Sequence, residues 1–350
     1  MLLRSRLKKE LVNLLTWKNK KFWIILIVFG IGLLITTKYK NQLPEDHGSL
    51  GNSVVQTRLD KIDNYDNVDS YRYWLYAGTS ERLHLLKDVD FSFWNEIPFR
   101  IDQYLQGICF AEEYLLVSAY CESEDMLGEL LIFDAKTGEY LLTLGMDEES
   151  HLGGVTYDGT YIWVCNSKKQ TLERLSYQVI CDLLKEHTGK MVNVTNLVDV
   201  YSVENIPSCI TFYDGSLWVA THQKWGSSRM VRYYYDVEND SLSSQSWYRI
   251  PSRVQGVAFR EDGAVMFSSS YGRRRSSCLV QYTSLSALSD KLYHWERMIE
   301  MPPCSEGIAY HEGKIYVVFE SAGEKYFAGT DGYGTSLSPL NRILIIWDQA

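Results

Sequence analysis

The chain has 350 residues, 45% of them hydrophobic and 23% charged, and a formal net charge of −9 at pH 7. This composition supports a sizeable core and excludes a generally disordered chain. The 7 prolines and 24 glycines exclude collagen-like and proline-rich repeats, and the 7 cysteines contain no Cys-x-x-Cys pair, which excludes zinc-ribbon and thioredoxin-type motifs.

The chain begins with a predicted membrane anchor. Residues 22–37 carry no charge and are bracketed by lysines at positions 20, 21, 38 and 40. As a helix they would span roughly 24 Å, a little less than a hydrocarbon layer of about 30 Å. A cleaved signal peptide is the alternative, but no Ala-x-Ala-like site follows the apolar stretch.

Charge is divided unevenly around this span. Seven basic residues and one acid precede it, which predicts a cytoplasmic tail at residues 1–21 and a single-pass plasma membrane protein whose remainder lies outside the cell. Residues 41–350 have a net charge of −17, which argues against a nucleic-acid partner. The polar residues 38–70 are predicted to form a flexible stalk, and residues 71–350 a folded domain.

Within that domain, one five-residue pattern occurs five times. Its second residues lie at positions 107, 154, 209, 256 and 307, so the spacing averages about 50 residues, as expected for a propeller or a solenoid. The copies are Gln106–Phe110, Gly153–Tyr157, Ser208–Phe212, Gln255–Phe259 and Glu306–Tyr310. Each copy is followed by a turn and a second apolar strand, and then by a third strand and a weaker fourth.

These units predict an all-β fold, a β-propeller of four-stranded blades preceded by one transmembrane helix. The last unit lacks a fourth strand, and we expect residues 96–101 to supply it and to close the ring of five blades. Six blades and an open solenoid are the alternatives. Helical insertions are expected at residues 176–188 and 285–295, on outer connections.

A propeller brings the starts of its first strands and the ends of its second strands to one rim of the central channel. Glu306 stands there at a position where the other four copies have uncharged residues, and it is the predicted catalytic acid or base. A solvated rim carboxylate, or one hydrogen-bonded to neighbouring backbone N–H groups, is the alternative. The predicted ligand-binding residues on this rim are Gln106, His151, His222, Gln255, Tyr271, Arg273 and Glu320.

Arginines are concentrated in one segment of this rim. Residues 268–277 contain three successive arginines flanked by hydroxyl side chains, a composition suited to binding carboxylate or phosphate. His151 and His222 lack metal-ligand spacing, so neither a metal site nor a cofactor is predicted.

The fourth unit resembles the five-bladed glutamine cyclotransferase propellers. The resemblance lies in Gln255-Gly256, in Ser270-Tyr271-Gly272-Arg273 and in the following Glu306-Gly307, and the first unit is similar through Gln106-Gly107. It implies that Glu306 acts as acid or base and that Gln255, Tyr271 and His151 orient the substrate. That family places its Glu-Gly pair nearer the N-terminus, whereas the unit after the first begins here with Gly153-Gly154. Uncharacterised secreted bacterial propellers show a similar pattern and imply no activity.

Two functions therefore stand as expectations. The first is a membrane-anchored external propeller that binds a peptide, glycan or protein at its rim, held to the lipid by residues 22–37. The second is a glutaminyl-peptide cyclase or a related hydrolase or lyase that uses Glu306. A buried Glu306 with hydrogen-bond partners would favour the second function, and a fully exposed carboxylate would weaken it.

Overall fold

A computed structural model describes residues 86, 89–96, 103–121, 127–147, 151–187, 189, 191–290, 295–336 and 339–348, all within one compact unit. The predicted tail, anchor and stalk lie outside these residues. Within the described part of the chain, none of the helices combines the length and the apolar character that crossing a bilayer requires. The transmembrane helix thus remains a prediction.

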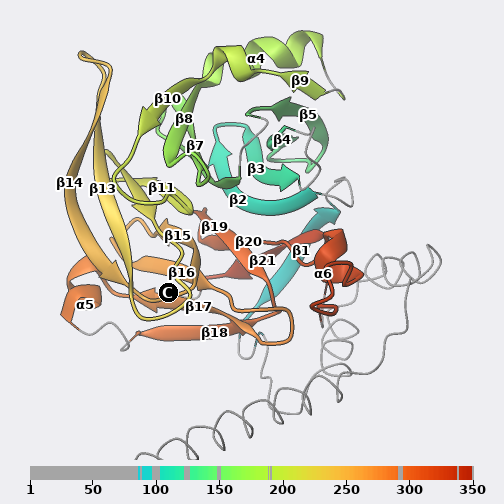
Figure 1. Cartoon of the computed structure of the whole chain (residues 1–350), viewed down its shortest axis with the longest axis vertical. Coiled ribbons are helices and arrows are strands. Elements are labelled where there is room, and N and C mark those ends of the chain that lie inside the picture. Colours follow the sequence, from blue (N-terminus) through green and yellow to red (C-terminus); the bar gives the residue numbers. More distant parts are fainter. Residues whose placement is uncertain are drawn as a thin grey trace, which may run out of the picture. The chain divides into compact units, whose positions relative to one another are not determined.

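The described residues form five sheets arranged as the blades of a propeller (Figure 1). Blade 1 contains β2 (Gln103–Ala111), β3 (Tyr114–Cys121), β4 (Glu129–Asp134), β5 (Tyr140–Gly145) and β9 (Met191–Asn193). Blade 2 contains β6 (Leu152–Tyr157), β7 (Tyr161–Asn166), β8 (Thr171–Ser176) and β10 (Asp199–Ser202). Blade 3 contains β11 (Cys209–Tyr213), β12 (Ser216–Ala220), β13 (Ser228–Asp236) and β14 (Ser241–Ile250). Blade 4 contains β15 (Val254–Phe259), β16 (Val265–Ser269), β17 (Ser277–Tyr282) and β18 (Arg297–Met301).

Blade 5 closes the ring. It contains β19 (Ser305–His311), β20 (Lys314–Phe319), β21 (Arg342–Trp347) and, as its outer strand, β1 (Phe91–Glu96). β1 pairs antiparallel with β21, so an early strand completes the last blade as expected. The predicted segment was wrong, however: the strand ends at Glu96, where the prediction began, and residues 97–101 lie outside the described residues. Phe91 explains the shift, since it packs into the core between blades 4 and 5.

Along the chain, short helices and one additional strand lie between the strands of the blades. α4 (Tyr177–Glu186) and α5 (Leu285–Asp290) lie on outer connections, where helical insertions are predicted, and α6 (Glu324–Phe327) lies between β20 and β21. A 3-10 helix, η1, covers Thr195–Leu197. After α4 the chain adds β9 in parallel to the edge of blade 1 before it returns to blade 2 as β10.

Hydrophobic cores fill all five interfaces between neighbouring blades. The core between blades 1 and 5, for example, joins Leu105 and Ile108 to Tyr316 and Val318. A linear stack of five units would have four such interfaces and two capped ends. The fifth interface therefore excludes the solenoid alternative and supports a five-bladed ring.

The glycine of the repeated pattern has a packing role. A Cβ atom on Gly107 would lie 2.7 Å from the Cα of Gly154, and one on Gly307 would lie 2.7 Å from the Cα of Gly107. The innermost strands thus meet at backbone contact around the axis. This closest approach of the inner strands is the waist of the channel. The cavity there has a volume of only about 10 Å³, so the two mouths of the channel are separate.

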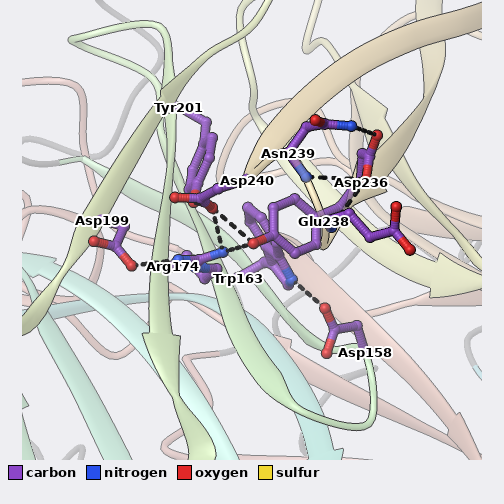
Figure 2. A network of polar contacts seen from close by, with 10 residues as sticks. Asp158, Trp163, Arg174, Asp199, Tyr201, Asp236, Glu238, Asn239 and Asp240 are labelled. Carbon is purple, nitrogen blue, oxygen red and sulfur yellow. Dashed lines mark hydrogen bonds and ion pairs between the residues drawn. The ribbon is translucent and has the colours of Figure 1, made fainter.

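A cluster of ion pairs and aromatic rings around Arg174 joins blade 2 to blade 3 (Figure 2). Arg174 on β8 binds Asp199 and Asp240. Its guanidinium carbon lies 4.4 Å from the ring centre of Tyr161 and 4.9 Å from that of Tyr235. Trp163 packs in the same cluster and donates a hydrogen bond of 2.7 Å to Asp158. Charge and aromatic packing are therefore combined where Asp240, at the β13–β14 turn, meets blade 2.

Candidate functional site

The first residues of the repeated pattern lie where the innermost strands depart from regular pairing. The strand register is irregular around Gln106, Gly153, Gln255 and Glu306, each of which falls between the residues that bound the shift. Bulges of this kind redirect side chains and are frequent next to binding and catalytic sites. Here they place the polar side chains of Gln106, Gln255 and Glu306 at one mouth of the channel.

Backbone conformation is also unusual beside two of these bulges. Arg253 and Cys304 each have a φ of 65°, and each lies two residues before the polar residue of its strand, Gln255 and Glu306 respectively. Non-glycine residues occupy this region rarely, and where they do the conformation costs about 1–3 kcal/mol and is often linked to function. The strained backbone therefore lies at the same mouth of the channel as the bulges.

Glu306 is buried beneath this mouth, with 2% of its surface exposed. Its Oε1 accepts a hydrogen bond of 2.7 Å from Nε2 of Gln255, and its carboxyl group is hydrogen-bonded to that of Glu320. Burial, followed by the negative charge of Glu320, raises the pKa of Glu306 well above its usual value. The solvated-carboxylate alternative is thus wrong, and Glu306 is the proton donor of the pair.

Glu320, directly after β20, is the acceptor. Besides the hydrogen bond from Glu306, it accepts one of 3.4 Å from Nε2 of Gln106 and one from the hydroxyl of Tyr326. Burial raises the pKa of Glu320, and the charge of Lys325 opposes this rise. The floor of the site is therefore a pair of hydrogen-bonded carboxyl groups whose pKa values are both raised.

A lysine held among tyrosines lies beside this pair. Nζ of Lys325 is 4.1 Å from the ring centre of Tyr104, 4.9 Å from that of Tyr120 and 5.0 Å from that of Tyr326. The rings of Tyr104 and Tyr120 stack at 4.9 Å, and His151 stacks on the other side of Tyr120 at 4.0 Å. His151 therefore supports the aromatic wall that holds the lysine.

A pocket of about 540 Å³ opens above the floor. It brings together five of the predicted ligand-binding residues, His222, Gln255, Tyr271, Arg273 and Glu320, whereas Gln106 and His151 lie beside the floor, outside the lining. The other lining residues are Lys224, Ser270, Gly272, Arg274, Arg275, Cys304, Tyr326 and Tyr333. Their ligand-binding role remains a prediction.

Arg273 has internal partners. Its guanidinium donates hydrogen bonds to the carbonyl oxygens of Lys325 and Gly334, both at 2.6 Å, and forms an ion pair with Asp331. It also lies 4.5 Å from the ring centre of Tyr326. In this structure Arg273 holds the segment that carries Lys325 and Tyr326, which makes it a positioning residue.

The exposed mouth of the pocket is cationic and aromatic. The guanidinium of Arg253 lies 3.8 Å from the ring centre of Tyr271, which also contacts Trp225 and Lys224. His222 stands on the same rim; loss of water around its ring, together with the charge of Arg253, lowers its pKa. Positive charge at neutral pH therefore comes from the lysine and the arginines.

Sequence reasoning missed Lys325, Tyr326 and Tyr333. They belong to the segment between β20 and β21, which is longer than the corresponding segments of the other blades and lies outside the repeat. The extra length of this segment is the sequence feature that could have pointed to these three residues. Among the described residues, no group of three or more His, Cys, Asp and Glu side chains has an arrangement suited to a metal ion.

Comparison with known proteins gives a likeness of fold only. The sequence matches no protein-family model and no curated protein. Among solved structures, a glutaminyl cyclase from Myxococcus xanthus is similar with a TM-score of 0.46 and 10% identity, over 73% of this chain and 95% of that one. A propeller of the glutaminyl cyclase kind is thus among the solved structures to which this chain is similar.

Two other solved structures match at the same level. An aldose sugar dehydrogenase from Streptomyces coelicolor, solved in its PQQ-bound form, gives a TM-score of 0.45 at 12% identity, over 74% of this chain and 98% of that one. The tail fibre of Staphylococcus aureus phage P68 gives 0.47 at 10% identity, over 76% and 54%.

Proposed function

We propose that this protein is a binding module whose ligand occupies the pocket above Glu306 and Glu320. The observation that carries the proposal is the convergence of His222, Gln255 and Tyr271 on one pocket over the hydrogen-bonded carboxyl groups of the buried Glu306 and the half-buried Glu320. Pockets that combine a few convergent polar groups with perturbed carboxyl groups are the usual places for ligands.

The charge of the rim indicates an anionic ligand. Residues 41–350 carry a net charge of −17, yet Lys224, Arg274 and Arg275 all line this one pocket. Arg274 and Arg275 are exposed, so they are available to a carboxylate or phosphate group. The amide of Gln255 and the carboxylate of Glu320 would meet a neutral polar part of the same ligand below.

Binding can be measured by calorimetry on the full-length chain in detergent micelles, with acidic peptides and acidic oligosaccharides as probes. We expect Tyr271→Ala and Arg275→Ala to weaken binding of any active probe by about 10-fold or more, since each removes a contact of about 1–2 kcal/mol. Lys136→Ala, at an exposed position outside the pocket, is the control. Unchanged affinity in both pocket variants would refute the proposal.

The second candidate function is enzymatic, and the buried, proton-sharing Glu306 is what favours it. In glutaminyl cyclisation, the α-amino nitrogen attacks the side-chain amide carbon, a lactam forms and ammonia leaves. In this candidate Glu320, which lines the pocket, would accept the proton of the attacking amine, and Glu306, hydrogen-bonded to it, would supply the proton that the departing nitrogen takes. Glu306→Gln would then abolish the release of ammonia from N-terminal glutaminyl peptides; equal or absent turnover in the wild type and the variant would remove this candidate.

The proposal includes anchoring of the protein in the membrane. An anchor at residues 22–37, with the basic residues 1–21 in the cytoplasm and the propeller outside, follows from the charge pattern around that span. Carbonate-resistant membrane association, together with digestion of the propeller by protease added to intact cells, would support this topology. Release by carbonate would refute the anchor.

A further inference from the structure

A second pocket, also of about 540 Å³, lies on the other side of the segment that joins β12 to β13. Three elements of blade 3 and two segments of blade 2 contribute to it. Its lining residues are Gln170, Glu204, Asn205, Ile206, Thr221, Gln223, Ser227, Ser228, Arg229, Trp247 and Arg249. None of these residues takes part in the site described above.

The two pockets share one wall. In residues 221–227, His222 and Lys224 line the first pocket, whereas Thr221, Gln223 and Ser227 line the second. From Thr221 to Lys224 successive side chains alternate between the two pockets, as side chains of an extended stretch do, and the chain bends at residues 224–226. The wall is also held in place, because N–H groups of Arg253 donate to the carbonyl oxygens of Gln223, at 2.8 Å, and Lys224, at 3.1 Å.

The second pocket has the chemistry of a sugar-binding surface. Only Ile206 and Trp247 among its lining residues are apolar, and the indole of Trp247 is 64% exposed. An exposed aromatic ring packs against the C–H face of a sugar, while amide and hydroxyl side chains exchange hydrogen bonds with sugar hydroxyls. Arg249, exposed on the same strand β14, adds a guanidinium group that suits a carboxylate (β13 and β14 in Figure 1).

The mouth of the first pocket repeats this combination. Trp225 is 64% exposed, and Tyr271 lies against the guanidinium groups of Arg253 and Arg275. Two adjacent pockets therefore each offer an exposed aromatic ring beside arginine, on a domain that is otherwise acidic. A ligand with repeated rings and repeated negative charges matches this arrangement.

We propose that the two pockets form one groove for an acidic polysaccharide, and that carboxylate-bearing sugar units occupy both sides of the 221–227 wall. The inference rests on the proposed function and deepens it by naming the ligand class. An acidic peptide is the competing ligand. It is less well matched, because the second pocket offers one exposed aromatic ring and few apolar surfaces for side chains.

Occupation of both pockets by one chain predicts a dependence on length. Oligogalacturonides of one to six units serve as probes in calorimetry on the full-length chain. Once a chain reaches across the wall, the second contact becomes intramolecular, so the hexamer should bind at least about 10-fold more tightly than the dimer. Affinity that does not change with length would overturn the shared groove.

The decisive variant is Trp247→Ala combined with Arg249→Ala. Both side chains are exposed, so folding should be little affected, and an unchanged melting temperature would verify this. We expect the double variant to lower hexamer affinity by about 10-fold or more while leaving dimer affinity in the first pocket intact. Trp295→Ala, at an exposed tryptophan outside both pockets, is the matched control and should change neither affinity.

The outcomes separate this inference from the proposed function. If Tyr271→Ala weakens hexamer binding but the Trp247 and Arg249 double variant does not, the shared groove is wrong and the first pocket stands. If poly-glutamate of equal charge binds more tightly than the hexamer and depends on Trp247, the groove belongs to an acidic peptide and the polysaccharide assignment is wrong. If no oligogalacturonide binds, the assignment is likewise wrong, and binding of another probe in the first pocket still tests the proposed function.

Discussion

Glu306 and Glu320 form a hydrogen-bonded carboxyl pair across the open end of a single hairpin. Glu306 lies near the start of β19 and Glu320 directly follows β20, whose Phe319 pairs with Ser305. Burial raises the pKa of both groups, and the negative charge of Glu320 raises that of Glu306 further. The pair therefore favours one shared proton over two full charges up to a higher pH than two separate carboxyl groups would.

This arrangement predicts how stability depends on pH. Because the folded pKa of Glu306 lies above its usual value of 4.5, the folded chain binds its proton more tightly than the unfolded chain does. The stabilising contribution is complete below pH 4.5 and is lost as the pH rises through the folded pKa. Glu306→Gln mimics the protonated acid, so the free energy of unfolding of the variant, relative to wild type, should increase as the pH rises above 4.5. Denaturant titrations at several pH values measure this difference, and a constant difference would contradict it.

The matched variant is Glu320→Gln, and its expected effect is opposite in sign. Glu320 accepts hydrogen bonds from Gln106, Tyr326 and Glu306, so an amide nitrogen at this position would face donors. A buried donor without an acceptor costs about 1–3 kcal/mol, and we expect the free energy of unfolding to fall by this amount. The same titrations at pH 7 measure the loss, and equal stability of the two variants would contradict the donor and acceptor roles assigned here.

The convergence of Gln106, Gln255 and Glu306 was predictable from the sequence because it follows from periodicity. Each is the first residue of one repeat, and equivalent positions in a closed ring meet at one mouth. The glycine that follows each of them was visible as well, although its reason, backbone contact at the waist, appears only in three dimensions.

Features outside the repeat were beyond sequence reasoning. Lys325 and Tyr326 reach the floor because α6 folds back over it, a route set by the contacts of Arg273 with Lys325, Asp331 and Gly334. Such contacts between distant residues leave no periodic signal. The closing strand was misplaced for a similar reason: the apolar pattern of residues 91–101 permits more than one register, and the packing of Phe91 selects β1.

Arg273 gives a prediction about the mobility of the site. Arg273→Lys keeps the charge but not the planar fork that binds two carbonyl oxygens and Asp331 at once. Hydrogen bonds to charged groups contribute about 1.5–3 kcal/mol, so the segment 324–336 should open more often by a factor of about 10 or more. Amide hydrogen exchange in that segment measures the change. Arg274→Lys, at the exposed neighbour, is the control, and equal exchange in the two variants would contradict the positioning role.

Backbone contact at the waist predicts that substitution by alanine affects stability differently at Gly107 and at Cys209. Gly107→Ala would bring a Cβ within 2.7 Å of the Cα of Gly154, and rigid inner strands leave little room for adjustment. Overpacking of this kind costs about 1–3 kcal/mol. Cys209 occupies the equivalent position of the third repeat, so Cys209→Ala adds no atom and should avoid this cost. Thermal unfolding of both variants tests the difference, and an unchanged melting temperature for Gly107→Ala would contradict backbone contact at the axis.

A cross-strand pair of tryptophan and arginine gives the last prediction. Trp163 pairs with Arg174 in blade 2, and Trp218 pairs with Arg232 in blade 3, but only Arg174 is enclosed by several rings and two carboxylates (Figure 2). Since cation–π contacts contribute about 0.5–2 kcal/mol each and Lys cannot stack as a planar group, Arg174→Lys should destabilise the fold by about 1–2 kcal/mol. Arg232→Lys, which is half-buried beside one ring, should have a smaller effect. Chemical denaturation compares the two variants, and an equal loss would show that enclosure by the aromatic rings of blades 2 and 3 adds nothing to the pairing.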